Sequence, residues 1–288
     1  MNTTIFSALF LPITLAVITF GLGLSISVQD LRNIIVLPRN IAVGLFSQLV
    51  LLPIIAFGIA IVTGLKTELA VGLILISICP GGATSNLVNF MVRANVALSI
   101  SITVINGLIT IVTIPLIAQL ALDIFMEQHA MIRLSFLESV LNIFMVTVLP
   151  ASVGILVRYY REEFAKRLED PLRYILPILL IIVFSAVLFL EKGNGQISIG
   201  DFLKILPYTF ALNILAMLAG LYFPRLFGIN KLNQVTIAVE VGLQNSTLAI
   251  FVAASLLGNY TIAMVAVVYG SFSFFTTWGF GYMARKYL

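Results

Sequence analysis

One acidic residue lies deep inside an apolar segment of the chain. Of the 12 acidic residues, Glu240 is the one flanked on both sides by apolar sequence, and the others fall in connections or near segment ends. A carboxylate inside a membrane-spanning segment is costly unless it is paired, protonated or bound to a cation. No Lys or Arg lies within one helical turn, so Glu240 predicts an ion site. The alternative is a protonated, hydrogen-bonded structural glutamate.

Two apolar segments are interrupted by polar and helix-breaking residues. The first interruption runs from Cys79-Pro80-Gly81-Gly82 into Ala83-Thr84-Ser85-Asn86, and the second runs from Glu240 to Thr247. Proline, glycine and residues of the N-cap type predict that one half-helix ends near Cys79 and another begins near Ser85. A simple kink would also explain the first interruption alone. Two broken helices in corresponding positions are typical of an inverted-repeat transporter.

Oxygen-bearing side chains near these breaks suit a hard monovalent cation, which takes about five or six oxygen ligands. Glu240 and Gln244 are i,i+4 neighbours, and Ser99 and Thr103 have the same spacing, so each pair shares one helix face. Gln48 adds an amide that needs a buried partner.

The elements that position these residues must be membrane helices. Of the 288 residues, 60% are apolar and 10% are charged, against about a quarter charged in soluble domains. One cysteine, Cys79, and one histidine, His129, exclude an internal disulfide and a Cys/His zinc cluster. The basic residues are scattered, which does not indicate a nucleic-acid surface.

The apolar segments predict an all-α polytopic membrane protein with nine transmembrane helices. They lack the two-residue alternation of a membrane barrel. The first is interpreted as a span rather than a removable signal peptide. The spans are predicted at residues 5–28, 41–63, 69–91, 96–122, 135–157, 172–190, 202–223, 232–257 and 261–283.

The basic residues predict the orientation of this array in a plasma (bacterial inner) membrane. Alternate loops place 12 Lys and Arg on one side and 4 on the other, namely Lys66, Arg133, Lys192 and Lys204. The richer side should be cytoplasmic. We therefore expect the N-terminus outside and the C-terminus in the cytoplasm.

The sequence resembles the bile acid:sodium symporter family, in particular its bacterial members and its nine-span form. The resemblance covers essentially the whole chain. It is carried by Phe20-Gly21-Leu22-Gly23-Leu24 with Asp30-Leu31, by Cys79-Pro80-Gly81-Gly82 running into Ser85-Asn86, by Asn95-Val96-Ala97-Leu98-Ser99, and by Glu240-Val241-Gly242-Leu243-Gln244-Asn245-Ser246.

The resemblance implies two sodium sites that share Glu240. The first is expected at Ser85, Asn86, Ser99, Thr103 and Glu240. The second is expected at Gln48, Glu240 and Gln244, with the backbone carbonyls of Val241 and Leu243. It further implies one transporter unit over residues 1–288, with a core of about 41–122 and 202–283 and a panel of about 5–28, 135–157 and 172–190. Two broken helices would cross in the core, and alternating access would move the core against the panel.

The cargo is expected to be an organic anion, either bile-acid-like or a small carboxylate. No Lys or Arg lies in the membrane interior, so the two half-helix N-termini, with Thr84, Asn245 and Thr277, are the expected anion donors. Ala83 and Thr276-Thr277 differ from residues found in some bacterial relatives, which leaves the cargo open. No obligatory protein partner is implied.

Three other functions compete with a sodium-coupled symporter. A proton-coupled organic anion carrier would use Glu240 as its proton site. A channel would need a repeated pore lining, whereas these polar residues gather at one place. An intramembrane enzyme is disfavoured because Ser85 has no histidine partner in the membrane.

Overall fold

The computed structural model describes residues 6–27, 29–30, 32, 36–65, 67–126, 135–189 and 199–287, and the regular structure in these ranges is entirely helical. The all-α prediction is therefore confirmed. Several residues named in the sequence analysis lie outside the described ranges: the span limits Ile5, Val28 and Leu190, the motif residue Leu31, the single histidine His129, and the basic residues Lys66, Arg133 and Lys192.

The helices follow the predicted segments closely. The α-helices are α1 (Leu11–Ser25), α3 (Pro38–Phe46), α4 (Leu52–Val62), α5 (Thr67–Ile78), α6 (Ala83–Met91), α7 (Val96–Phe125), α8 (Phe136–Ile143), α9 (Leu149–Tyr160), α10 (Glu162–Phe189), α11 (Ile199–Tyr222), α12 (Lys231–Gly242), α13 (Ser246–Phe251) and α14 (Tyr260–Tyr287). Short π-helical segments continue several of them, namely η1 (Phe6–Phe10), η2 (Ser47–Leu51), η3 (Phe144–Val148) and η5 (Val252–Leu256), and η4 (Phe223–Phe227) is a 3-10 turn.

Seven of the described helical stretches are long and apolar enough to cross a membrane, and the count reaches up to nine when each bent pair is one span. The first bent pair is α5 with α6, which meet at 63°. The second lies within α10, where Glu162–Leu172 and Tyr174–Val187 meet at 45°. The predicted nine spans are the upper value of this range.

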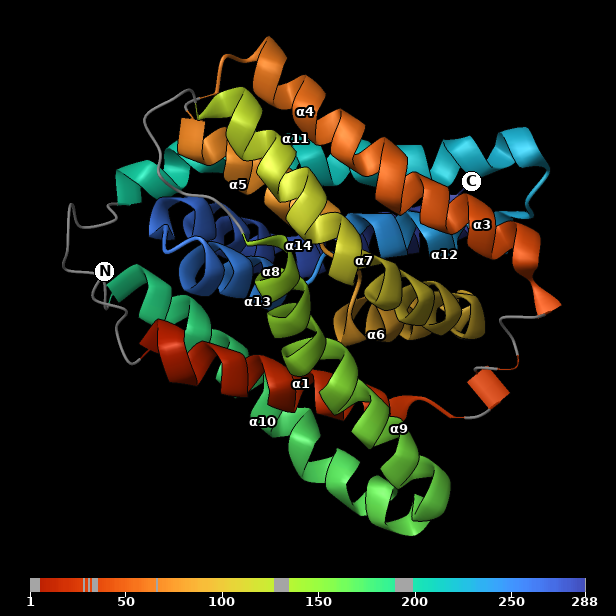
Figure 1. Ribbon diagram of the computed structural model, residues 1–288. Helices are drawn as coiled ribbons and strands as arrows, with labels where there is room; N and C mark the ends of the chain where they lie inside the picture. The colour runs from red at the N-terminus through yellow and green to blue at the C-terminus, as the bar shows by residue number, and fades with distance from the viewer. Residues whose placement is uncertain are drawn as a thin grey trace.

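Helices α1, α9 and α10 pack against one another on one side of the molecule (Figure 1). Helices α5, α7, α11, α12 and α14 form the larger group, with α14 in contact with α5, α11, α12 and α13. The span Lys231–Leu256 contains α12 and α13. In its apolar 18-residue stretch 94% of the residues are buried, whereas in the corresponding stretch of Phe136–Tyr160 the share is 17%. The segment that carries Glu240 is therefore the centre of the fold.

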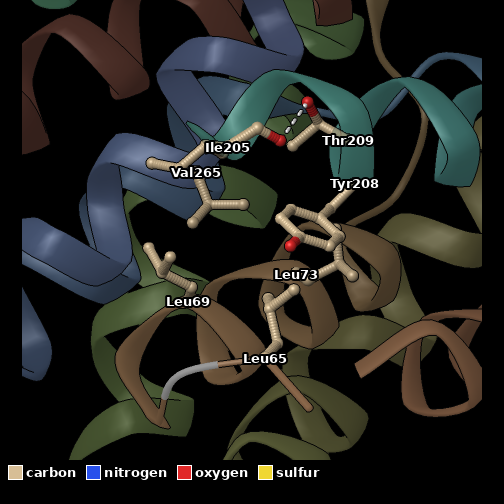
Figure 2. A pocket seen from close by; sticks show the side chains of 7 residues that line it. All are labelled: Leu65, Leu69, Leu73, Ile205, Tyr208, Thr209 and Val265. Carbon is tan, nitrogen blue, oxygen red and sulfur yellow. Dashed lines mark hydrogen bonds between the residues drawn. The ribbon is translucent and has the colours of Figure 1, made fainter. Parts of the chain in front are cut away.

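An apolar crevice lies between α5, α11 and α14 (Figure 2). It is lined by Leu65, Leu69, Leu73, Ile205, Tyr208, Thr209 and Val265. The Thr209 hydroxyl donates to the carbonyls of Ile205 (3.3 Å) and Leu206 (3.0 Å) in its own helix. The crevice lies near the start of α5, away from the break that follows Ile78.

Candidate ion site

The two predicted helix breaks contact each other. Residues 79–82 separate α5 from α6, and residues 243–245 separate α12 from α13. The backbone N–H of Asn245 donates to the carbonyl of Pro80 at 2.8 Å. A Cβ added to Gly81 would lie 2.6 Å from Glu240 Oε2, so a residue without a side chain is needed for this approach. The breaks therefore bring non-helical backbone and Glu240 to one place.

The Glu240 carboxylate is fully buried and is held by hydroxyl groups from α7. Ser99 donates to Oε1, and Thr103 donates to Oε2 at 3.0 Å. These two hydroxyls are one turn apart on the same face of α7, as their spacing predicts. The Ser85 hydroxyl lies beside the carboxylate and donates to the carbonyl of Gly82 at 2.8 Å. No ion pair involves Glu240 in the described part of the chain.

Two asparagines of α6 extend this cluster. Asn86 Oδ1 accepts from the Ser99 hydroxyl at 2.7 Å, and Asn89 Nδ2 donates to the same hydroxyl at 2.9 Å. Asn89 is fully buried, and its Oδ1 finds no hydrogen-bond partner among the described residues. The structure thus gathers all five residues of the first expected sodium set, Ser85, Asn86, Ser99, Thr103 and Glu240. Carboxylate, amide and hydroxyl oxygens are the donors that a hard cation prefers.

The second expected set lies at the end of α12. Gln48 Nε2 donates to Gln244 Oε1 at 3.3 Å, and Gln244 Nε2 donates to the Val241 carbonyl at 2.7 Å. Leu243 has extended backbone angles (φ −115°, ψ 112°). Gln48 Oε1 is buried without a hydrogen-bond partner in the described residues. An unpaired buried oxygen is costly, and a cation would supply the missing partner.

The three expected anion donors have different environments. Thr84 is exposed in the first turn of α6. The Asn245 side chain accepts from the Leu248 N–H at 3.0 Å and so caps α13. Thr277 is fully buried, and its hydroxyl donates to the Gly242 carbonyl at 3.3 Å. Only the first of these is on an open surface.

Sequence reasoning missed four fully buried polar residues in or near these breaks: Asn89, Asn106, Asn213 and Tyr269. Asn106 lies one turn beyond Thr103 on α7, and both of its amide atoms lack a described hydrogen-bond partner. A polar side chain inside an apolar segment itself indicates a functional site. In addition, Asn89 lies three positions after Asn86, and Asn106 lies three positions after Thr103, so each pair shares one helix face.

Comparison with known proteins identifies the family of the chain. The model of the Sodium Bile acid symporter family matches residues 12–199. The chain belongs to this family. The expected resemblance is thereby confirmed.

Three relatives of this chain have names that refer to sodium-dependent transport or sodium cotransport. The chain is 31% identical over 249 residues to the uncharacterized sodium-dependent transporter YocS of Bacillus subtilis, covering 85% of this chain and 74% of that protein. It is 28% identical over 261 residues to the probable sodium/metabolite cotransporter BASS1 of Arabidopsis thaliana, covering 88% and 61%. It is 26% identical over 264 residues to the human sodium-dependent organic anion transporter, covering 90% and 68%.

These comparisons assign the chain to membrane transporters rather than enzymes. The relatives are named as sodium-dependent, which supports the use of sodium by this chain and agrees with the oxygen-rich cluster around Glu240.

Proposed function

We propose that this protein is a symporter that moves a small organic anion together with sodium across the bilayer. The observation that carries the proposal is the Glu240 carboxylate. It is fully buried, has hydrogen bonds from the neutral hydroxyls of Ser99 and Thr103, and lies where the two breaks meet. A buried negative charge without an ionic partner is compensated by a cation, and a transported cation is then stabilised only while the breaks are in contact.

Two sodium ions are proposed, one for each oxygen set. Ser85, Asn86, Ser99 and Thr103 surround one side of Glu240. Gln48, Gln244 and the carbonyls of Val241 and Leu243 form the other set. Glu240 is proposed to serve both sets because it supplies the negative charge where the two breaks meet, and in this structure both of its oxygens accept hydrogen bonds from the first set, Oε1 from Ser99 and Oε2 from Thr103. The unpaired oxygens of Asn89 and Gln48, one near each set, support this assignment.

The co-transported solute is proposed to be a carboxylate or sulfonate. Two sodium ions against one carboxylate leave about one net positive charge, so sodium and anion binding favour each other by mutual linkage. Thr84 is exposed in the first turn of α6, and Asn245 lies in the second break, whose backbone contacts the break before α6. We assign these two residues to the anion. Thr277 joins them only if its buried hydroxyl is released from Gly242.

Alternating access is proposed between two groups of helices. The panel is α1, α8 to α9 and α10, and the packing of α1 on α9 and α10 supports it as a unit. The core contains both breaks, on α5–α6 and α12–α13. Movement of the core against the panel would carry the ion sites from one side of the membrane to the other.

A proton-coupled carrier is the second candidate. It is favoured by the same buried carboxylate, because hydroxyl groups can also stabilise a protonated Glu240. The uncharged oxygens beyond the carboxylate, including the unpaired Gln48 Oε1, favour sodium over a proton.

Uptake into proteoliposomes separates these functions. Radiolabelled taurocholate and a set of short-chain monocarboxylates are supplied at fixed pH, with sodium in one arm and choline in the other. We expect uptake and counterflow in sodium alone. Uptake in choline driven by a pH gradient would support the proton carrier, and sodium-dependent uptake without counterflow would support a channel.

The chain is proposed to lie in the plasma (inner) membrane with its N-terminus outside and its C-terminus in the cytoplasm. The division of 12 and 4 basic residues supports this orientation. A reporter fused after Leu288 should be active only if it is a cytoplasmic reporter. A periplasmic signal would contradict the orientation without affecting the ion sites.

A further inference from the structure

The carbonyl of Gly242, the last residue of α12, accepts hydrogen bonds from two other helices. Asn213 Nδ2 of α11 donates to it at 2.7 Å, the Tyr269 hydroxyl of α14 at 2.7 Å, and the Thr277 hydroxyl of α14 at 3.3 Å. All three donor residues are fully buried. A carbonyl oxygen has two lone pairs, so three donors saturate it and leave none for a cation.

The Asn213 amide has a fixed orientation. Its Oδ1 accepts from the Thr276 hydroxyl at 2.7 Å, so the opposite end of the amide, Nδ2, must face Gly242. The Tyr269 hydroxyl lies 3.3 Å from the same Nδ2. The three donors therefore form a connected clamp, defined here as Asn213, Tyr269 and Thr277, rather than three separate contacts.

The clamp sets the direction of the next carbonyl. Leu243 has extended backbone angles, and successive carbonyls across an extended residue point to opposite sides. Holding the Gly242 carbonyl toward α11 and α14 therefore turns the Leu243 carbonyl away from them. The side chains of Gln244 and Gln48 contact each other beside the Val241 carbonyl, which is where the second sodium set is proposed.

We infer that Tyr269 and Asn213 are positioning residues for the second sodium site. They hold the Gly242 peptide so that the carbonyls on either side of it, at Val241 and Leu243, remain available to the ion. Thr277 acts with them in this structure, which gives its buried hydroxyl a role other than contact with the anion. This inference rests on the proposed sodium coupling.

The test is the sodium dependence of thermal unfolding of the purified full-length protein in detergent. Sodium chloride is titrated against choline chloride at constant ionic strength. Tyr269→Phe removes one hydroxyl and keeps the ring, and we expect it to raise the half-saturating sodium concentration about tenfold, which one lost buried hydrogen bond accounts for. Tyr208→Phe is the matched control, because Tyr208 lines the apolar crevice of Figure 2 and should leave half-saturation unchanged.

A structural role alone would lower the unfolding temperature equally in sodium and in choline and leave half-saturation unchanged, and that result would overturn the inference. Thr276→Val provides a second measurement if Tyr269→Phe does not fold, since Thr276 is only partly buried and acts by orienting Asn213. We expect about a threefold rise for it, and an unchanged value would likewise overturn the inference. If the wild-type protein shows no sodium response, the proposed function fails instead.

Discussion

The break between α5 and α6 bends the chain by 63°, whereas the break between α12 and α13 lies in a continuous, almost fully buried span. The first break contains Pro80, Gly81 and Gly82, and α6 beyond it exposes Thr84 and Phe90. The second has a single glycine, and every residue from Asn233 to Gly242 is buried.

The two breaks thus contribute different properties to one site. The first contributes space, because Gly81 lets the backbone approach the carboxylate. The second contributes the charge and is stabilised by side-chain hydrogen bonds to its carbonyls. The first should therefore be sensitive to added volume, and the second to lost polar groups.

Glu240→Gln is expected to have the largest effect, because it removes the charge that the second break supplies to both ion sets. The saturable sodium response in thermal unfolding should disappear, with no saturation up to about 100 times the wild-type half-saturating concentration. Glu138→Gln, an exposed carboxylate on α8, is the control. A normal sodium response in Glu240→Gln would contradict the site.

Gln48→Ala tests whether the second break has an ion set of its own. One sodium set should be lost and one retained, so that the sodium titration becomes a single weaker transition. Ser47→Ala is a neighbouring control, because the Ser47 hydroxyl donates to the Val43 carbonyl in its own helix at 2.8 Å. Complete loss of the sodium response in Gln48→Ala would show that the two sets are not separable.

Gly81→Ala tests the role of space in the first break. The added methyl group would lie 2.6 Å from Glu240 Oε2 and 3.1 Å from Ser85 Oγ, so we expect a loss of about 1–3 kcal/mol in sodium binding. A Cβ at Gly82 meets nothing within 4 Å, and its backbone is extended. Gly82→Ala should therefore behave like wild type, and equal effects of the two variants would break the comparison.

Asn245→Ala is expected to have the smallest effect on folding. Loss of the cap on α13 should cost about 1 kcal/mol of stability. Asn230→Ala removes the equivalent cap of α12, far from the breaks, and should cost the same. Only Asn245→Ala should also weaken binding of the transported anion, measured by competition for uptake. Equal anion affinity in the two variants would remove Asn245 from the anion site.

Much of the fold follows from hydropathy, because the residues of a membrane-spanning helix are apolar along most of its length. Span 96–122 was predicted, and α7 runs from Val96 to Phe125, with Asn95 capping its first turn. The sixth span was expected to begin at Leu172, whereas α10 begins at Glu162. Lys166 Nζ forms an ion pair with Glu162 Oε1 at 2.9 Å, which lowers the pKa of Glu162. This i,i+4 pair stabilises the first turns of α10, before its apolar part begins.

The site was predictable where the partners share one helix. The Ser99 and Thr103 pair follows from an i,i+4 spacing. The clamp on Gly242 does not, because Asn213 and Tyr269 are 29 and 27 positions away from their acceptor and meet it only after three helices have packed. The π-helical turn η2 at Gln48 was also missed, since it depends on packing rather than on a residue type.

The Ser99 hydroxyl has one proton and two lone pairs. One lone pair accepts from Asn89, while Asn86 Oδ1 and Glu240 Oε1 both lie within reach of the single proton. Only one of these acceptors can have it at a time. A cation bound beside Glu240, as proposed, would weaken the hydrogen bond of the carboxylate to that proton, so the O–H bond would turn to Asn86 and the second lone pair would turn to the ion. Binding and release of the proposed cation would then each be accompanied by the rotation of one O–H bond.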